Sequence, residues 1–402
     1  MATRAPEVAP ALRQARFAAA AGFFTQGLVF ISLTTRLPDV QEKWSLSSVE
    51  MSVLLLMMVL LAGVGSLAAE MVATRSDSAE VLRAGLLLIT VSLPVIVLAP
   101  AFAMFAAALA LYGVALGVVD ATTNMQAVAL EHRYGRPILP SFHGAWTLGG
   151  LVGSALTLAT GNLGLGAAAW LAVVPLAVCF APLLRRADVP VSDNIDVPWR
   201  PILLVGLALV LFYMVDTAAS TWGPTYLDKT FPTPSGLVAL ATFPYLLASL
   251  VFRFAGDALV ARHGVVHVLR VGAVVSSAAL AVIVFAPTWP VAVLGFTLLG
   301  AGAAVIAPLS FSAAARIAGG DTLDADARAA RVDAVIARFN QFNYAGALLG
   351  AVLTGLVGAD SLRYGFALPM VLVLGILPLA PAFAGRAGVR FHHGMQSNPR
   401  IP

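Results

Sequence analysis

Two acidic residues stand inside long apolar stretches of this chain. Asp120 directly follows residues 84–119, and Asp216 lies between residues 201–215 and 217–227, none of which contain Asp, Glu, Lys, Arg or His. A carboxylate within hydrocarbon costs at least about 2.5 kcal/mol, so both side chains should face other helices or a water-filled interior. Because intramembrane carboxyl groups are typical of proton relays, we expect Asp120 and Asp216 to exchange protons. The alternatives are a structural hydrogen bond between helices for Asp120, and a packing cluster or an outer gate for Asp216.

Neutral polar and aromatic side chains lie in the same kind of apolar segment and could bind a solute. Asn124 follows Asp120 by one helical turn, and Tyr213 precedes Asp216 by about one turn. Hydrogen-bonding side chains without a central pair of Arg or Lys favour a sugar or another small polar molecule over a phosphate or a dicarboxylate. The predicted solute-binding residues are Gln26, Asn124, His143, Trp146, Tyr213, Trp222, Asn340, Gln341 and Asn343.

The composition predicts an all-α membrane protein. The chain is 59% hydrophobic and only 11% charged, whereas soluble domains are about 25% charged. A helix needs about 20 apolar residues to cross a bilayer, where every backbone amide must bond within its own segment. Twelve segments meet this requirement: 16–37, 48–72, 81–99, 101–130, 139–160, 163–184, 201–227, 234–260, 265–286, 289–317, 332–358 and 361–384.

The distribution of basic residues predicts the orientation. With the N-terminus in the cytoplasm, 20 Lys and Arg residues fall on the inner side, and only Arg36, Lys43, Lys229 and Arg363 fall outside. Such a bias is the positive-inside pattern of membrane proteins. We therefore expect a multi-pass protein of the bacterial inner membrane with both termini in the cytoplasm. Arg36, at an outer helix end, is expected to extend its guanidinium toward the membrane surface.

The two halves of the chain resemble each other. Glu70, Arg75, Arg83 and Gly85, around the end of the second segment, match four residues around the end of the eighth at an offset of 187. Residues 142–156 match residues 339–353 at an offset of 197. Parallel repeats of this kind are typical of transporters with a binding site between the halves. We therefore predict two pseudo-symmetric six-helix bundles, residues 16–184 and 201–384. A cytoplasmic N-terminal segment (1–15), a linker (185–200) and a cytoplasmic tail (385–402) complete the chain.

The loop after the eighth segment resembles the signature loop of the major facilitator superfamily. Gly256, Asp257, Arg262 and Gly264 carry the likeness, whereas the first copy has Ala69 and Glu70 in place of Gly and Asp. The resemblance implies alternating access, with a charge network that clamps the cytoplasmic helix ends in one state. The residues expected to form this network are Glu70, Arg75, Arg253, Asp257, Arg262 and Arg270.

A finer likeness is to a bacterial branch near the fucose–proton symporters. It rests on Gly113, Gly117, Asp120 and Asn124 in the fourth segment, on the Gly135-Arg136-Pro137 and Ser141-Phe142-His143 stretches, and on Asp216 with Trp222. This resemblance implies proton-coupled movement of a small polar solute.

Other classes of function lack their motifs in the sequence. It contains no Walker-type phosphate loop and no HExxH, CxxC or GxSxG, which argues against an ATP-driven pump and against an enzyme. We expect no cofactor and no metal, no nucleic-acid partner, and a protein that functions as a monomer with a solute, protons and lipid. Two alternatives remain: proton-driven efflux of hydrophobic or cationic compounds, and a transport-fold sensor without turnover, for which the cytoplasmic loops are short.

Overall fold

A computed structural model describes residues 10–73, 76–134, 138–185, 199–319, 335, 339 and 341–384. Within these residues the chain forms α-helices and short 3-10 helices, and no strand. The first half contains α1 (Pro10–Thr34), α2 (Leu37–Trp44), α3 (Ser48–Ala73), α4 (Ser78–Leu98), α5 (Phe102–Tyr134), α6 (Leu139–Thr160), η1 (Gly161–Leu163), η2 (Leu165–Ala172) and α7 (Val173–Cys179). The second half contains α8 (Trp199–Thr230), η3 (Ser235–Ala241), α9 (Phe243–His263), α10 (Val265–Val284), α11 (Trp289–Ala303), α12 (Ile306–Gly319), α14 (Gln341–Val357), α15 (Leu362–Leu372), η4 (Val373–Gly375), α16 (Ile376–Leu379) and η5 (Ala380–Phe383).

The helical content confirms the predicted fold class. In the described part of the chain, nine helical segments are long and apolar enough to cross a membrane, and the shorter segments Leu165–Cys179 and Gln341–Val357 are also apolar. Together with α6, they place helical structure in each of the twelve predicted segments. The predicted domain boundaries remain predictions, because residues 186–198 and 385–402 lie outside the described residues.

Several helix boundaries differ from those predicted, and at two of them a proline is the reason. The first segment was expected to reach residue 37, but α1 ends at Thr34 and a separate helix, α2, begins at Leu37. Pro38 lies at the start of α2. It is tolerated there because the N–H groups of the first helical turn have no partner within the helix. The tenth segment is divided into α11 and α12 at residues 304–305. Pro308 explains this break, because it has no N–H to donate to the carbonyl of Ala304.

Arg36 does not extend toward the membrane surface, and that expectation was wrong. Its side chain is only 3% exposed, and its guanidinium donates to Thr160 Oγ1 at 2.7 Å and to the Gly164 carbonyl at 3.1 Å. Asp39 lies at 3.4 Å from Arg36 Nη1, and burial raises the pKa of this carboxyl although the nearby Arg36 opposes the rise. The arginine thus connects the chain after α1 to the end of α6. Carbonyl groups at the end of a helix have no partner within the helix, so they can accept hydrogen bonds from Arg36.

Glycines at repeat-related positions bring equivalent helices into close contact. A Cβ at Gly149 would lie 2.0 Å from the Phe24 carbonyl oxygen, and one at Gly346 would lie 2.5 Å from that of Val210. These glycines are 197 residues apart, so the α1–α6 crossing of the first half has its counterpart in the α8–α14 crossing of the second. The repeat found in the sequence is therefore also a repeat of helix packing.

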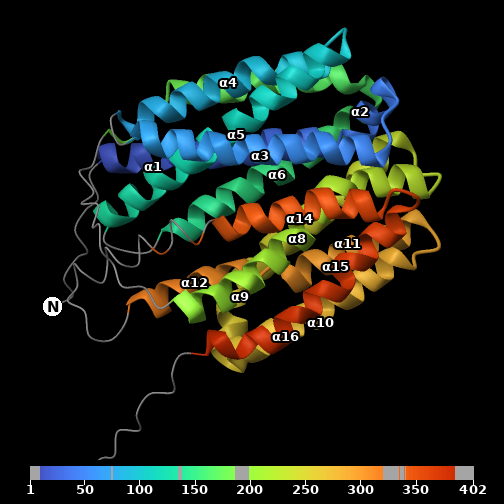
Figure 1. Cartoon of the computed structure of the whole chain (residues 1–402). Helices are drawn as coiled ribbons and strands as arrows, with labels where there is room; N and C mark the ends of the chain where they lie inside the picture. Colours follow the sequence, from blue (N-terminus) through green and yellow to red (C-terminus); the bar gives the residue numbers. More distant parts are fainter. Residues whose placement is uncertain are drawn as a thin grey trace, which may run out of the picture.

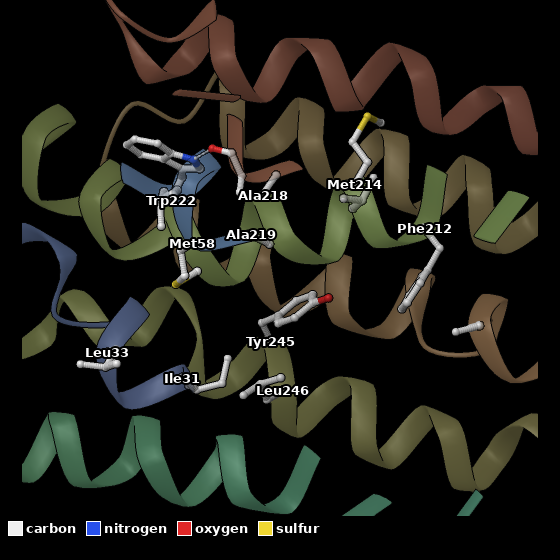
Figure 2. Packing of buried hydrophobic residues seen from close by; sticks show 14 of the residues in the cluster. Ile31, Leu33, Met58, Phe212, Met214, Ala218, Ala219, Trp222, Tyr245 and Leu246 are labelled. Atoms are coloured by element: carbon white, nitrogen blue, oxygen red, sulfur yellow. Dashed lines mark hydrogen bonds between the residues drawn. The ribbon is translucent and has the colours of Figure 1, made fainter. Parts of the chain in front are cut away.

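The two halves lie against each other along their inner helices (Figure 1). α3 packs on α14, while α6 packs on α9 and η3. Figure 2 shows buried side chains of α1 and α3, such as Ile31 and Met58, beside Ala219 of α8 and Tyr245 of α9. The core therefore continues from one half into the other.

Candidate solute and proton site

Asp120 joins the two halves through hydrogen bonds. It lies near the middle of α5, where Gln26 Nε2 of α1 donates to its Oδ1 at 3.1 Å. The hydroxyl of Tyr344, in the first turn of α14, donates to its Oδ2. α1 and α5 belong to the first half and α14 to the second, so one carboxylate is held from both sides of the interface.

Tyr344 was missed by the sequence analysis, although Asn343 beside it was selected. The offset of 197 relates Tyr344 to Thr147, and this relation was the available signal. Asn124, in contrast, donates from its side-chain amide to the backbone carbonyl of Asp120 at 2.9 Å. Asn124 therefore bonds to its own helix and leaves the carboxylate to Gln26 and Tyr344.

Asp216 has its partner within one half. It lies near the middle of α8, and its Oδ1 accepts a hydrogen bond from the hydroxyl of Tyr245 on the neighbouring α9. Ser220, one turn further along α8, donates to the Asp216 backbone carbonyl at 2.8 Å. Sequence reasoning did not select Tyr245, because the residue lies in an otherwise apolar segment with no motif around it.

Arg253 is located away from the helix end at which it was expected. Ten residues of α9 follow it, which corresponds to roughly 15 Å of helix. Its Nη1 donates to Thr147 Oγ1 of α6, in the other half, at 3.0 Å. The guanidinium also interacts electrostatically with Asp216 and with His143. A cation therefore lies among the candidate solute residues, where the sequence analysis assumed that only neutral hydrogen-bonding groups were present.

Aromatic side chains surround these polar groups. The ring of His143 lies between Phe23 of α1, at 5.5 Å between ring centroids, and Phe311 of α12, at 6.1 Å. Tyr213 interacts electrostatically with Asp120, Asp216 and Arg253. Trp146 contacts Phe30 at 6.4 Å. His143, Trp146 and Tyr213 are all half-buried.

Trp222 differs from the other predicted solute-binding residues. It is fully buried, and its Nε1 donates to the Ala351 carbonyl of α14 at 2.7 Å (Figure 2). Its ring also packs against Gly355, where a Cβ would lie 2.2 Å from the indole. Trp222 therefore holds α8 against α14 in this conformation, and the structure does not bring it to a surface that a solute reaches.

Some of the remaining residues predicted to bind solute or to form the charge network lie outside the described residues. Gln341 is exposed and Asn343 is half-buried at the start of α14, whereas Asn340 lies outside the described residues. In the expected charge network, Glu70, Arg262 and Arg270 are exposed. Arg75 and the side chain of Asp257 are not described, so this network stays a prediction. The described residues contain no cluster of three or more His, Cys, Asp or Glu suited to a metal ion.

The chain is similar to known transporters in both sequence and fold. No family model matches the chain. An uncharacterized MFS-type transporter from Yersinia pestis is 26% identical over 381 residues, which cover 90% of this chain and 93% of the relative. An uncharacterized transporter from Sinorhizobium fredii is 29% identical over 318 residues, covering 74% of this chain and 81% of the relative. A solved nucleoside transporter, NupG, has a TM-score of 0.68 over 93% of this chain and 98% of its own. The chain is thus similar over most of its length to transporters of the major facilitator type.

Other solved major facilitator proteins have the same fold. FucP in its outward conformation gives a TM-score of 0.61 over 92% of this chain and 98% of its own, at 16% identity. A bacterial homologue of the lysosomal transporter Spinster gives 0.63 over 94% and 97%, at 13% identity. At such identities these likenesses concern the fold alone. The sequence relatives and the shared fold together support a multi-pass membrane transporter of the major facilitator type. Its solute has to be inferred from its own residues.

Proposed function

We propose that this major facilitator transporter moves a small polar solute across the bacterial inner membrane by alternating access, coupled to protons through Asp120. The observation behind this proposal is the carboxylate of Asp120, which accepts hydrogen bonds from Gln26 of the first half and Tyr344 of the second. Alternating access requires the halves to separate on one side and close on the other. A titratable group that bonds both halves is suited to control that motion.

Protonation of Asp120 would change this link directly. An ionised carboxylate only accepts hydrogen bonds, whereas a protonated carboxyl group carries a donor on one oxygen and accepts less strongly. The bond from Tyr344 would weaken when Asp120 takes a proton, so the halves would move more freely. Proton binding on one side of the membrane would in this way favour reorientation of the carrier.

The half-buried residues between the halves support binding of a polar solute. His143, Trp146, Tyr213 and Asn343 offer hydrogen bonds and aromatic faces from helices of both halves. Solved structures with the same fold include a nucleoside transporter, NupG, and a fucose:proton symporter, FucP. Small polar solutes are therefore the first class to test. The proposed carrier works as a monomer with both termini in the cytoplasm, as the distribution of Lys and Arg predicts.

Purified protein in liposomes that contain a pH-sensitive dye tests this function. We expect addition of an accepted polar solute, from a panel of sugars, nucleosides, sugar acids, amino acids and cationic drugs, to drive proton movement in the wild type. Asp120→Asn should abolish the proton movement but retain exchange of solute. The control Asn124→Ala alters a polar residue one turn away that does not bond the carboxylate. Proton movement that is intact in Asp120→Asn would contradict the proposal, and transport restricted to cationic drugs would favour efflux.

A further inference from the structure

Arg253 has more hydrogen-bonding capacity than its described neighbours use. A guanidinium offers five N–H donors, and the described contact of Arg253 is the 3.0 Å bond from Nη1 to Thr147 Oγ1. Its Nε is buried and has no hydrogen-bond partner among the described residues. The Thr147 hydroxyl in turn donates to the His143 carbonyl at 3.1 Å. The arginine therefore contacts the first half through a neutral oxygen.

A positive charge in this position calls for an anion. A charged group in a low-dielectric interior is costly unless it is paired, and a buried N–H without an acceptor adds a further penalty. The planar guanidinium matches a carboxylate especially well, because two parallel N–H bonds reach its two oxygens. An anionic group of a ligand would supply the missing acceptors.

The two described carboxylates of the site, those of Asp120 and Asp216, do not supply them. Asp216 interacts electrostatically with Arg253, but no ion pair within 4.0 Å joins the two residues in the described structure. Its Oδ1 is bonded instead by Tyr245. Asp120 accepts bonds from Gln26 and Tyr344, on helices other than α9.

The repeat also sets Arg253 apart. The position related to it by the offset of 187 is Ser66 on α3, so the first half has no matching cation. The pair Arg253–Thr147 corresponds to the pair Ser66–Tyr344, because Thr147 and Tyr344 are related by the offset of 197. Tyr344 also interacts with Ser66. A polar contact between the halves needs only a hydroxyl at this position, as Ser66 shows, so the guanidinium has a further role.

We propose that Arg253 binds a carboxylate of the transported solute, which makes the substrate a small polar monocarboxylate such as a sugar acid. This inference rests on the proposed transport function and replaces the neutral sugar favoured by the sequence analysis. Asp120 and Asp216 both interact electrostatically with Tyr213, as Arg253 does, and they oppose additional negative charge. A singly charged carboxylate therefore suits this site better than a doubly charged phosphate.

Transport of matched solutes tests the inference. The probes are D-glucuronate, D-glucose and inorganic phosphate, measured by counterflow in liposomes at equal pH on both sides, so that solute binding is separated from proton coupling. We expect the wild type to move D-glucuronate with a KM at least tenfold below that for D-glucose, and not to move phosphate. Arg253→Gln should raise the KM for D-glucuronate roughly 10- to 100-fold, the value of hydrogen bonds to a charged group. It should leave the KM for D-glucose unchanged, and Arg253→Lys should restore part of the preference.

Arg133→Gln is the matched control, because it removes one positive charge from an exposed position at the end of α5. Size-exclusion chromatography and thermal unfolding of each variant exclude misfolding as the cause of a lost preference. The inference is overturned if Arg253→Gln changes both KM values equally or neither, or if the wild type moves none of the carboxylate probe. A preference for D-glucuronate that follows Arg253 while Asp120→Asn leaves proton movement intact would instead sink the coupling proposal and keep this inference.

Discussion

Asp120 and Asp216 are alike in sequence context but differ in what their carboxylates connect. Each lies near the middle of a long apolar helix, and each accepts a hydrogen bond from a tyrosine hydroxyl. The tyrosine of Asp120 comes from the other half of the molecule, whereas that of Asp216 comes from the neighbouring helix of its own half. In the proposed mechanism, a proton on Asp120 would therefore act on a contact between the halves. A proton on Asp216 changes the charge of the site next to Arg253 without releasing a contact between the halves.

Asp120→Asn should have the largest effect on coupling. The amide keeps a similar shape but cannot exchange a proton, so solute-driven proton movement should be abolished while solute exchange remains. The liposome pH assay measures this change. Asp216→Asn is the comparison, and we expect it to alter the KM for the solute more than the proton movement. Equal loss of proton movement in both variants would show that the two carboxylates act as one unit.

Tyr344→Phe should shift the balance between conformations. It removes a hydrogen bond to a charged group, worth about 1.5–3 kcal/mol, from the contact between the halves. Labelling of a cysteine introduced by Gly144→Cys, where a Cβ meets no atom within 4 Å, can report the change once Cys179→Ala removes the native thiol. We expect the labelling rate to change about tenfold or more. An unchanged rate, with the protein folded, would mean that the Tyr344–Asp120 bond does not hold the halves together.

Tyr245→Phe is the matched change in the other region. It removes the same kind of bond from Asp216, but both partners move together in the second half. We expect a lower thermal unfolding temperature, with little change in the Gly144→Cys labelling rate. If this variant instead shifts labelling as strongly as Tyr344→Phe does, the distinction between the two carboxylates is wrong.

Thr147→Val should have the smallest effect. It removes the neutral acceptor of Arg253, a hydrogen bond to a charged group worth about 1.5–3 kcal/mol, but the guanidinium keeps its charge and its other donors for the solute. The KM for D-glucuronate should change by less than about tenfold, far less than in Arg253→Gln. A larger rise in this KM would indicate that Thr147 positions Arg253 for the solute. The counterflow assay would test this by comparing the KM values of Thr147→Val and Arg253→Lys.

The sequence alone determined the helices, the repeat and the positions of the two carboxylates along their helices. These features are local, because the length of an apolar run and the lack of water in the bilayer dictate a spanning helix wherever the run occurs. The same local reasoning failed at α2 and at the division of α11 from α12, where a single proline decides the helix boundary.

Only the tertiary structure decided which side chains meet. The bond between Asp120 and Tyr344 joins residues 224 positions apart, and it depends on how α5 and α14 are rotated about their axes and pressed together. The burial of Arg36 against the end of α6, and the position of Arg253 opposite Thr147, depend on the same packing. Composition predicts that a charge in the membrane must find a partner, but the partner is chosen by close packing of glycine-rich helix crossings, which no local pattern encodes.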